Sequence, residues 1–581
     1  MKKRFLGLAL GALAVLLMII LSSCNNVTEK KKKTILFDDT LPLSEPDDNV
    51  HIRVKTSSEP SIVYAPLRSA AGYRYGPSII YYPDGSCDAW FSCMGTQGEW
   101  DFISYRHSDN GFDFGDEIVV LRPNPLSMDF FSCCDPGVVY FNGYYYLGYT
   151  STTFDGGVNN NVFVARSENP DGPYEKWNGS GWGGDPAPII YYDEDESKYG
   201  AGEPSFVVVG DKLYIYYSWI CQHGSFLGVA VADTSENWPL SIEDYGPVFN
   251  KKNCDSVDMM FLEDNSKFYG FCTSERFSEN SGVTVIESSD GINFEIVDVV
   301  KDGTYQYLHN DGVAHRPDGH VQIKDNTFFA YAFSNGDEGN WGKWATAFQE
   351  IKIELYEGKI VRNDKNEKGI KCDDYFSEPL TDPKPIIIST TSRVFNFMQH
   401  YVGEAVHVVW YDSNLEVHAV DDIKNVKFYG YDKSLMSMDG NNITIKGKVG
   451  ETFVYFDYRG QTGFFKVRIF ETGTTIPGDP KKEILSFTPV IDSFKLSLSA
   501  LHKYQIRGKV EFSDHTWAEA FNDGYMIDAK TYPVKFEVKD KSIITVSSKG
   551  IITPVAVGKT EVTVTIKDGP SFTVPVEVTD N

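Results

Sequence analysis

The chain has 581 residues and a formal net charge of −27 at pH 7, with 14% aromatic residues, 50 glycines and 27 prolines. This length exceeds what one hydrophobic core supports, and the composition is typical of short strands joined by turns, so we expect two to four mainly β domains. The negative charge argues against nucleic acid as a partner and leaves room for a neutral ligand or a local basic pocket.

Residues 1–23 have the features of a signal peptide. Lys2, Lys3 and Arg4 precede the apolar stretch 5–20, and the sequence Leu-Ser-Ser-Cys ends at Cys24. This ending resembles a bacterial lipobox, whose cysteine becomes lipidated; an ordinary signal or an anchor helix is the alternative. We therefore expect a lipid anchor on Cys24, a tether over residues 24–50 and a location on the bacterial cell envelope, on either face of the membrane.

Eight cysteines follow Cys24. They form no Cys-x-x-Cys pair and no cysteine–histidine spacing that indicates zinc. Most of them are interpreted as small buried hydrophobic residues, and Cys87 with Cys93 could bridge a hairpin.

A repeated pattern starts at three carboxylates. "DPGVVYFNGYYYLGYT" begins at Asp135, "EPSFVVVGDKLYIYYS" at Glu203 and "DMMFLEDNSKFYGFCT" at Asp258, and each runs through an apolar strand and a turn to Ser or Thr. Related segments begin at Gly76 and Gly319. The spacings of 55 to 68 residues give each unit room for four strands.

These five units predict an all-β, five-bladed β-propeller over residues 51–372, closed by a strand that precedes Tyr75. Equivalent positions of a propeller point equivalently, so Asp135, Glu203 and Asp258 should meet at one axial cavity. The alternative for each carboxylate is a structural one, in which it caps a turn or holds a loop.

The Asp-Pro strand with "NGYYYLGYTS", the segment "ARSENPDGPYEKW" and the acid-Pro strand with "LYIYYS" resemble the five-bladed glycosidases around glycoside hydrolase family 43 and their invertase-like relatives. The resemblance implies a carbohydrate substrate, a catalytic base, a modulating Asp and a Glu general acid. Glu203 matches the general acid and Asp135 matches the base or the modulator. Asp258 matches the same position in the fourth unit.

The first unit departs from this family pattern. Gly76 stands where the family has Asp, which removes the usual base, and Glu59 and Asp185 are possible substitutes. Two ionisable carboxyl groups with separated pKa values are what glycosidic cleavage needs. Either the roles have moved to other carboxylates, or the site binds sugar without cleaving it.

Further side chains are expected around the cavity. His315 and Arg316 could position a sugar hydroxyl, a uronate or a phosphate, which also keeps phosphorolysis open, and Arg74 would share their rim. Trp219 and His223 follow the third hairpin and are candidates for substrate contact. An axial calcium or sodium ion is compatible with the relatives, but no loop has calcium-binding spacing, so we expect no required cofactor.

The C-terminal part contains a second repeat. "DKSLMSMDGNNITIKGKVGETFVYFDY" from Asp432 aligns with "DKSIITVSSKGIITPVAVGKTEVTVTI" from Asp540 at a constant offset of 108. We expect two immunoglobulin-like β-sandwiches at 386–470 and 485–581, separated by a linker at 471–484. The second resembles a bacterial immunoglobulin-like domain of group 2.

Together these features predict a lipid-anchored glycoside hydrolase that cleaves a polysaccharide or oligosaccharide by carboxylate acid/base catalysis. The main alternative, motivated by Gly76, is a surface lipoprotein that binds glycans without cleaving them. A third hypothesis is an adhesin for a protein partner, whose identity the sequence does not indicate.

Overall fold

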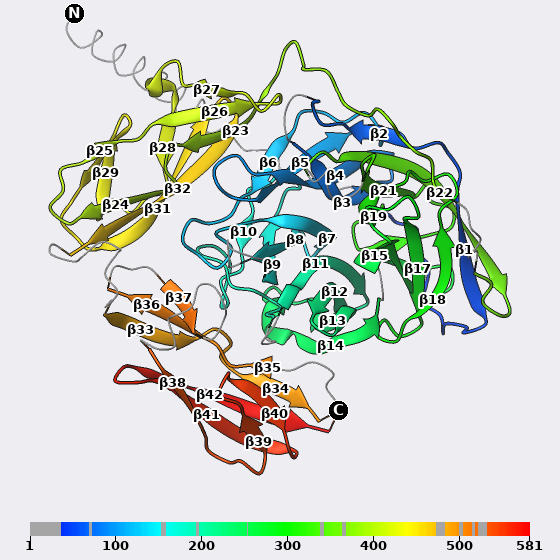
Figure 1. Cartoon of the computed structure of the whole chain (residues 1–581). Coiled ribbons are helices and arrows are strands. Elements are labelled where there is room, and N and C mark those ends of the chain that lie inside the picture. Colours follow the sequence, from blue (N-terminus) through cyan, green and yellow to red (C-terminus); the bar gives the residue numbers. More distant parts are fainter. Residues whose placement is uncertain are drawn as a thin grey trace, which may run out of the picture. The chain divides into compact units, whose positions relative to one another are not determined.

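The computed structural model describes residues 36–580, with gaps at 69–71, 153–158, 193–196, 252–253, 337–341, 363–367, 472–482, 499–503, 514–516 and 521–531 (Figure 1). The predicted signal peptide and Cys24 lie outside the described residues. Within these residues no helix is long and apolar enough to cross a membrane.

The first half of the chain forms antiparallel meanders. One sheet holds, in order, β3 (Arg74–Tyr81), β4 (Cys87–Met94), β5 (Asp101–Ser108) and β6 (Ile118–Leu121). A longer sheet holds β7 (Cys134–Phe141), β8 (Tyr144–Thr152), β9 (Asn160–Ser167) and β10 (Glu175–Lys176), and continues through β11 (Ser197–Val209), β12 (Lys212–Cys221), β13 (Gly224–Asp233) and β14 (Glu243–Asn250).

Two more sheets complete this part of the fold. One holds β15 (Cys254–Leu262), β16 (Lys267–Ser274), β17 (Gly282–Ser288) and β18 (Glu295–Val300), with β20 (His320–Val321) beside β15. The other holds β19 (Leu308–Val313), β21 (Phe328–Phe333), β22 (Ala345–Glu357) and β1 (Val50–Thr56), with β2 (Ser61–Tyr64) also paired to β22. The N-terminal β1 thus completes a sheet built from the end of this region, as the predicted closing strand would.

The leading strands of these meanders lie next to one another in a closed cycle. β3 contacts β7, β7 contacts β11, β11 contacts β15, β15 contacts β19, and β19 contacts β3 (Figure 1). Side chains join neighbouring members of the cycle: the backbone N–H groups of Val138 and Met259 donate to Ser78 Oγ and Ser205 Oγ, each at 2.9 Å. The arrangement is that of a propeller, with the leading strands around the axis.

An irregularity near the start of each leading strand points one residue at the axis. The register shifts between Tyr75 and Ser78 on β3, and at the corresponding places on β7, β11, β15 and β19. A β-bulge re-aims a side chain in this way. The bulges on β3, β7, β11 and β19 have a residue with positive φ: 54° at Gly76, 49° at Asp135, 53° at Glu203 and 39° at Asn310.

The last leading strand differs from the sequence-based prediction. We expected it to begin at Gly319, but β19 begins at Leu308, and Gly319 has φ 87° in the turn before β20. β20 is a short strand that pairs in parallel with β15. The prediction was wrong because the apolar pattern after Gly319 resembles a leading strand, whereas the bulge that marks one lies at Asn310.

The predicted tether also differs in its described part. Phe37 packs against the guanidinium of Arg316, with 4.1 Å between the Arg316 Cζ atom and the ring centroid. The Leu41 N–H donates to Glu263 Oε2 at 2.8 Å, and the Ser44 N–H donates to Ser266 Oγ at 3.0 Å. From Leu36 onward the chain is therefore bound to the sheets rather than solvated.

Cys87 and Cys93 cannot form the disulfide that the sequence suggested. Both lie on β4, where a rise of about 3.3 Å per residue separates them by roughly 20 Å. A disulfide requires Cα atoms within about 7 Å. The expected hairpin between them does not exist because the turn of this meander precedes Cys87.

The C-terminal region contains one strand topology twice. Its first copy consists of the sheets β23 (Pro385–Thr390)–β26 (Val408–Asp412)–β27 (Val417–Ala419), β24 (Val394–Met398)–β32 (Gln461–Phe470)–β31 (Gly450–Tyr458)–β28 (Lys427–Tyr429), and β25 (Glu404–Ala405)–β30 (Asn442–Ile445)–β29 (Met436–Asp439). Each copy has its own hydrophobic core and one parallel pair of strands.

The second copy repeats these sheets in the same order. It consists of β33 (Ile484–Pro489)–β36 (Gly508–Phe512)–β37 (Trp517–Ala520), β34 (Phe494–Ser497)–β42 (Ser571–Thr579)–β41 (Gly558–Ile566)–β38 (Val534–Val538), and β35 (Tyr504–Gln505)–β40 (Ile551–Pro554)–β39 (Ile544–Val546). The repeated topology is the structural counterpart of the sequence repeat at offset 108.

Candidate functional site

The leading strands bring the predicted carboxylates to one axial cavity. A narrow cavity of about 30 Å³ is lined by Gly76, Asp135, Glu203, Asp258 and Asn310, among other residues. The sequence-based expectation that Asp135, Glu203 and Asp258 converge is therefore met. The bulges on β7 and β11 produce this convergence by turning Asp135 and Glu203 toward the axis.

A larger pocket adjoins the axial cavity, and Glu203 lines both. It has a volume of about 240 Å³, which is about eight times the share of one water molecule in the liquid. Its walls are formed by Asn160, Tyr199, Gly200, Gly202, Glu203, Ser218, Ile220, Ser225, Cys254, Asp255 and Arg276. The pocket therefore combines room for a small polar ligand with two carboxylates and a guanidinium.

Glu203 is arranged as a protonated acid. Burial, followed by the negative charge of Asp255, raises the pKa of Glu203 to about 8, while Lys251 acts in the opposite direction. The hydroxyl of Ser218 donates a hydrogen bond to Glu203 Oε2, and the Glu203 N–H donates to Thr150 Oγ1 at 2.6 Å. At neutral pH this carboxyl group holds its proton and can donate it.

Asp135 is arranged as the ionised partner. Burial raises its pKa to about 6, with hydrogen bonds from Thr150 and Cys134 limiting the rise. Asn310 Nδ2 donates to Asp135 Oδ1 at 3.0 Å, and the Asp135 N–H donates to Ser92 Oγ at 2.7 Å. Above pH 6 Asp135 is mainly a carboxylate, so the two groups divide into an acid and a base.

Asp255 is a pocket carboxylate that the sequence reasoning missed. It follows Cys254 on β15 just as Asp135 follows Cys134 on β7, and each aspartate lies within a register shift of its strand. Burial opposes its ionisation, but Arg276, whose Nη1 donates to Asp255 Oδ2 at 2.5 Å, and His309 hold the pKa of Asp255 well below its usual range. Asp255 thus contributes a permanent negative charge.

The missing signal was the Cys-Asp pair at the start of the fourth leading strand. Sequence reasoning assigned the equivalent position to Asp258, three residues later, because Asp255 is followed by Ser256 instead of Pro. In the structure the residue equivalent to Asp135 on β15 is Asp255, and Asp258 lies three residues further along the strand.

Asp258 lines the axial cavity but is occupied by hydrogen bonds between strands. Ser205 Oγ donates to its Oδ1 at 2.7 Å, and the Val313 N–H donates to its Oδ2 at 2.8 Å. Burial raises the pKa of Asp258. The carboxyl group therefore ties β15 to β11 and β19.

Three other predicted site residues lie away from the pocket. Asp185 accepts from Lys466 Nζ at 2.9 Å, and Arg74 forms a two-pronged ion pair with Glu117 at 2.6 and 2.7 Å. Trp219, on β12, is 1% exposed and packs in the core, because alternate residues of that strand face the interior. These interactions do not support a catalytic role for Asp185 or substrate contacts for Arg74 and Trp219.

The His315–Arg316 pair lies at the opposite end of the leading strands. His315 pairs with Ile80, four residues along β3 from Gly76 and hence about 13 Å away. Arg316 is fully occupied by Asp325 at 2.8 and 2.9 Å and by Asp39 at 3.0 Å. Arg316 therefore binds the N-terminal segment, whereas His315 Nδ1 lies 2.7 Å from the Arg316 carbonyl oxygen.

His223, the last predicted contact, is exposed in the turn between β12 and β13. It stands between the pocket residues Ile220 and Ser225 in the chain, but is not itself part of the pocket wall.

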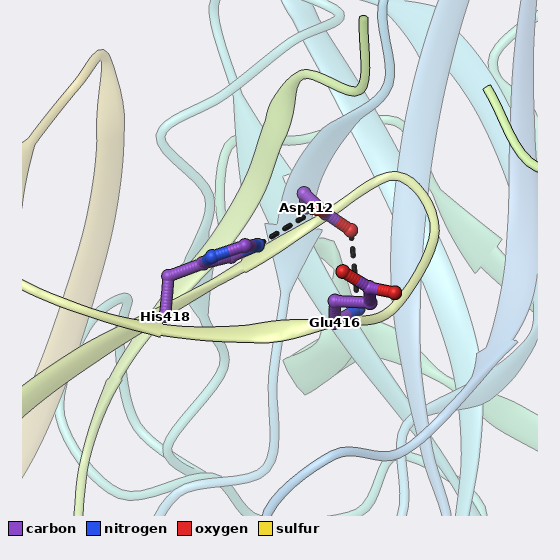
Figure 2. A group of neighbouring side chains, drawn as sticks. All are labelled: Asp412, Glu416 and His418. Carbon is purple, nitrogen blue, oxygen red and sulfur yellow. Dashed lines mark hydrogen bonds and ion pairs between the residues drawn. The ribbon is translucent and has the colours of Figure 1, made fainter. Parts of the chain in front are cut away.

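A separate group of possible metal ligands occurs in the C-terminal region. Asp412, Glu416 and His418 have ligand atoms within 4.8 Å of one another (Figure 2). Asp412 already accepts from His418 Nε2 at 2.8 Å and from the N–H groups of Asn414 and Glu416. These hydrogen bonds hold the turn between β26 and β27, which explains why the three side chains lie together.

Several solved structures that are similar to this chain are glycoside hydrolases. Zg3597, a family 117 glycoside hydrolase from Zobellia galactanivorans, is 19% identical over 53% of this chain and 92% of its own, with a TM-score of 0.41. The α-L-arabinofuranosidase PaAbf62A from Podospora anserina is 12% identical over 51% and 96%, with a TM-score of 0.39. A thermostable family-43 glycoside hydrolase is 13% identical over 54% and 98%, with a TM-score of 0.35.

Comparison of sequences identifies one segment. Residues 522–578 match the family of bacterial immunoglobulin-like domains, group 2, as the C-terminal repeat predicted. No curated protein matches the chain at a significant level.

Proposed function

We propose that the chain is a glycoside hydrolase in which Glu203 is the general acid and Asp135 is the base. One observation carries this proposal: two buried carboxyl groups of the axial site have opposite preferred protonation states at neutral pH, and one lines a pocket. Glycosidic cleavage needs such a pair, one to protonate the leaving oxygen and one to act on the anomeric carbon or on water.

In the proposed reaction a sugar ring enters the pocket and its glycosidic oxygen takes the proton of Glu203. As the bond breaks, positive charge develops on the sugar ring, and the permanent negative charge of Asp255 stabilises it. Asp135 either removes a proton from the attacking water, or attacks the anomeric carbon to form a glycosyl-enzyme that water hydrolyses with Glu203 now acting as the base. Arg276 and Lys251 offset the negative charge of Asp255.

The proposal explains how the site could work with Gly76 in place of the family's Asp. The basic role moves to Asp135, and Asp255 supplies the third acidic group from β15. Gly76 also favours the second candidate, a protein that binds a glycan at this pocket without cleaving it.

The test compares the soluble protein beginning after Cys24 with its Glu203→Gln variant, on a panel of plant and bacterial polysaccharides and aryl-glycosides. We expect the parent to release sugar and the variant to lose at least about a hundredfold in kcat, the usual contribution of a general acid. Full activity of Glu203→Gln would refute the assignment of the acid. Glycan binding without product from either protein would favour the binding function.

We further propose that the chain consists of a five-bladed propeller followed by two immunoglobulin-like modules. A lipid on Cys24 would anchor it to the cell envelope. The cycle of leading strands and the repeated C-terminal topology support the proposed domain organisation. Metabolic labelling with a fatty-acid analogue should label the parent in its native bacterium, and Cys24→Ser should abolish the label. Equal labelling of both would refute lipidation at this residue.

A further inference from the structure

We propose that Lys251 is a positioning residue for the acid Glu203 and acts on it through the hydroxyl of Ser218. This inference rests on the proposed function, in which Glu203 protonates the leaving group. It adds a residue outside the carboxylate set.

Two hydrogen bonds connect Lys251 to Glu203 through Ser218, and the donor of each is fixed. Lys251 is 2% exposed, and its Nζ donates to Ser218 Oγ at 2.6 Å and to the Asp255 carbonyl oxygen at 2.5 Å. An ammonium group has no acceptor, so Ser218 must accept from Lys251 and use its single hydrogen toward Glu203. Glu203 Oε2 is the acceptor of that hydrogen.

This direction determines which oxygen of Glu203 carries the acidic proton. Because Oε2 accepts from Ser218, it behaves as the carbonyl oxygen of the neutral carboxyl group, and the proton resides on Oε1. Ser218 also lies opposite Gly202 in the β11–β12 ladder, directly before Glu203. The backbone thereby holds the donor in place, and a single orientation of the acid is selected.

Lys251 also acts on the charge of Glu203. The groups that face Glu203 are Asp255 on β15 and Asp135 on β7, which favour the protonated form, and Lys251, which favours the ionised form. Arg276, after β16, is paired with Asp255. Lys251 therefore limits the increase in the pKa of Glu203, and keeps the acid strong enough to give up its proton near neutral pH.

The test measures the protonation of Glu203 directly. Infrared difference spectra over a pH series would follow the carboxylic-acid C=O band that Glu203→Gln removes. In Lys251→Met we expect this band to persist to a pH at least about one unit higher than in the parent, since a cation is lost. Lys267→Met is the matched control: Lys267 is also buried, but it pairs with Glu287 and the Val50 carbonyl.

Ser218→Ala provides a second variant in case Lys251→Met does not fold. In this variant the C=O band of Glu203 should also persist to a higher pH, because a hydrogen bond to the ionised form of Glu203 is lost. On a cleaved substrate, both variants should lower kcat about tenfold with little change in KM, and should move the alkaline limb of the pH profile upward. An unshifted Glu203 band in both variants would overturn the inference. A shifted band in a protein that cleaves nothing would instead overturn only the proposed function.

Discussion

At the scale of single residues, the pKa values of Glu203 and Asp135 predict a bell-shaped pH dependence. Activity requires Asp135 ionised and Glu203 protonated, so kcat/KM should rise as the pH passes about 6 and fall as it passes about 8. Because the two groups interact, these limbs belong to the pair. Measurement of kcat/KM across both limbs checks this, and a rate that increases steadily through pH 8 would contradict Glu203 as the acid.

Gly76 leaves room for a carboxylate side chain at the first bulge. A Cβ atom at Gly76 would lie 3.7 Å from Asp135 Oδ1 and 3.5 Å from Asn310 Nδ2, which is ordinary contact. The φ of 54° strains any side chain placed at this position, but Asp135 and Glu203 tolerate 49° and 53° at the equivalent bulges.

Gly76→Asp should therefore fold and place a second carboxylate beside Asp135. Repulsion between like charges should move the acid limb of the pH profile upward by about one unit. Gly76→Ala is the control, with the same added Cβ and no charge. If the parent is inactive and Gly76→Asp cleaves the glycan that the parent only binds, the natural protein is a binding protein.

The sequence could predict Asp135 and Glu203 because an acid-Pro pair occurs at both bulges. It could not predict Asp255, since Ser256 replaces the proline and the contacts that keep Asp255 ionised come from Arg276 and His309, far along the chain. Trp219, in contrast, was predicted as a site residue but lies in the core. An aromatic residue near the end of a hairpin resembles a sugar contact, but the direction of its side chain depends on the register of β12.

At the scale of strands, the apolar patterns predicted the meanders and the closing role of β1. They misplaced the last leading strand, because β19 is short and its Asp311-Gly312 segment lacks the tyrosine-rich hairpin of the other units. The position of a leading strand is decided by its neighbours on both sides, which a single sequence does not display.

Asp258 should act on the stability of the strands and not on proton transfer. In Asp258→Ala, Ser205 and the Val313 N–H lose their buried acceptor, which should reduce the free energy of unfolding by about 1–3 kcal/mol. Urea denaturation measures this loss, and the pH limbs of the folded variant should match the parent. A large loss of kcat with unchanged stability would return Asp258 to the catalytic set.

At the scale of the whole molecule, the sequence predicted separate regions from changes in repeat length. It treated residues up to 50 as a tether because the stretch before Leu36 is rich in lysine. The described segment instead supplies Phe37, Asp39 and Leu41 to a surface formed by Arg316 and Glu263. Local composition could not show this, since the partners lie more than 200 residues away.

This segment should be part of the folded domain. A protein that begins at Val50 would leave Arg316 without the Phe37 ring and the Asp39 carboxylate, and Glu263 without the Leu41 N–H. We expect its melting temperature to be several degrees lower than that of a protein beginning at Leu36. Because these contacts lie at the end of the leading strands opposite Gly76, the pKa values of Asp135 and Glu203 should not change. Equal melting temperatures would show that residues 36–49 behave as a tether after all, and a displaced pH profile would show that the two ends of the axis are coupled.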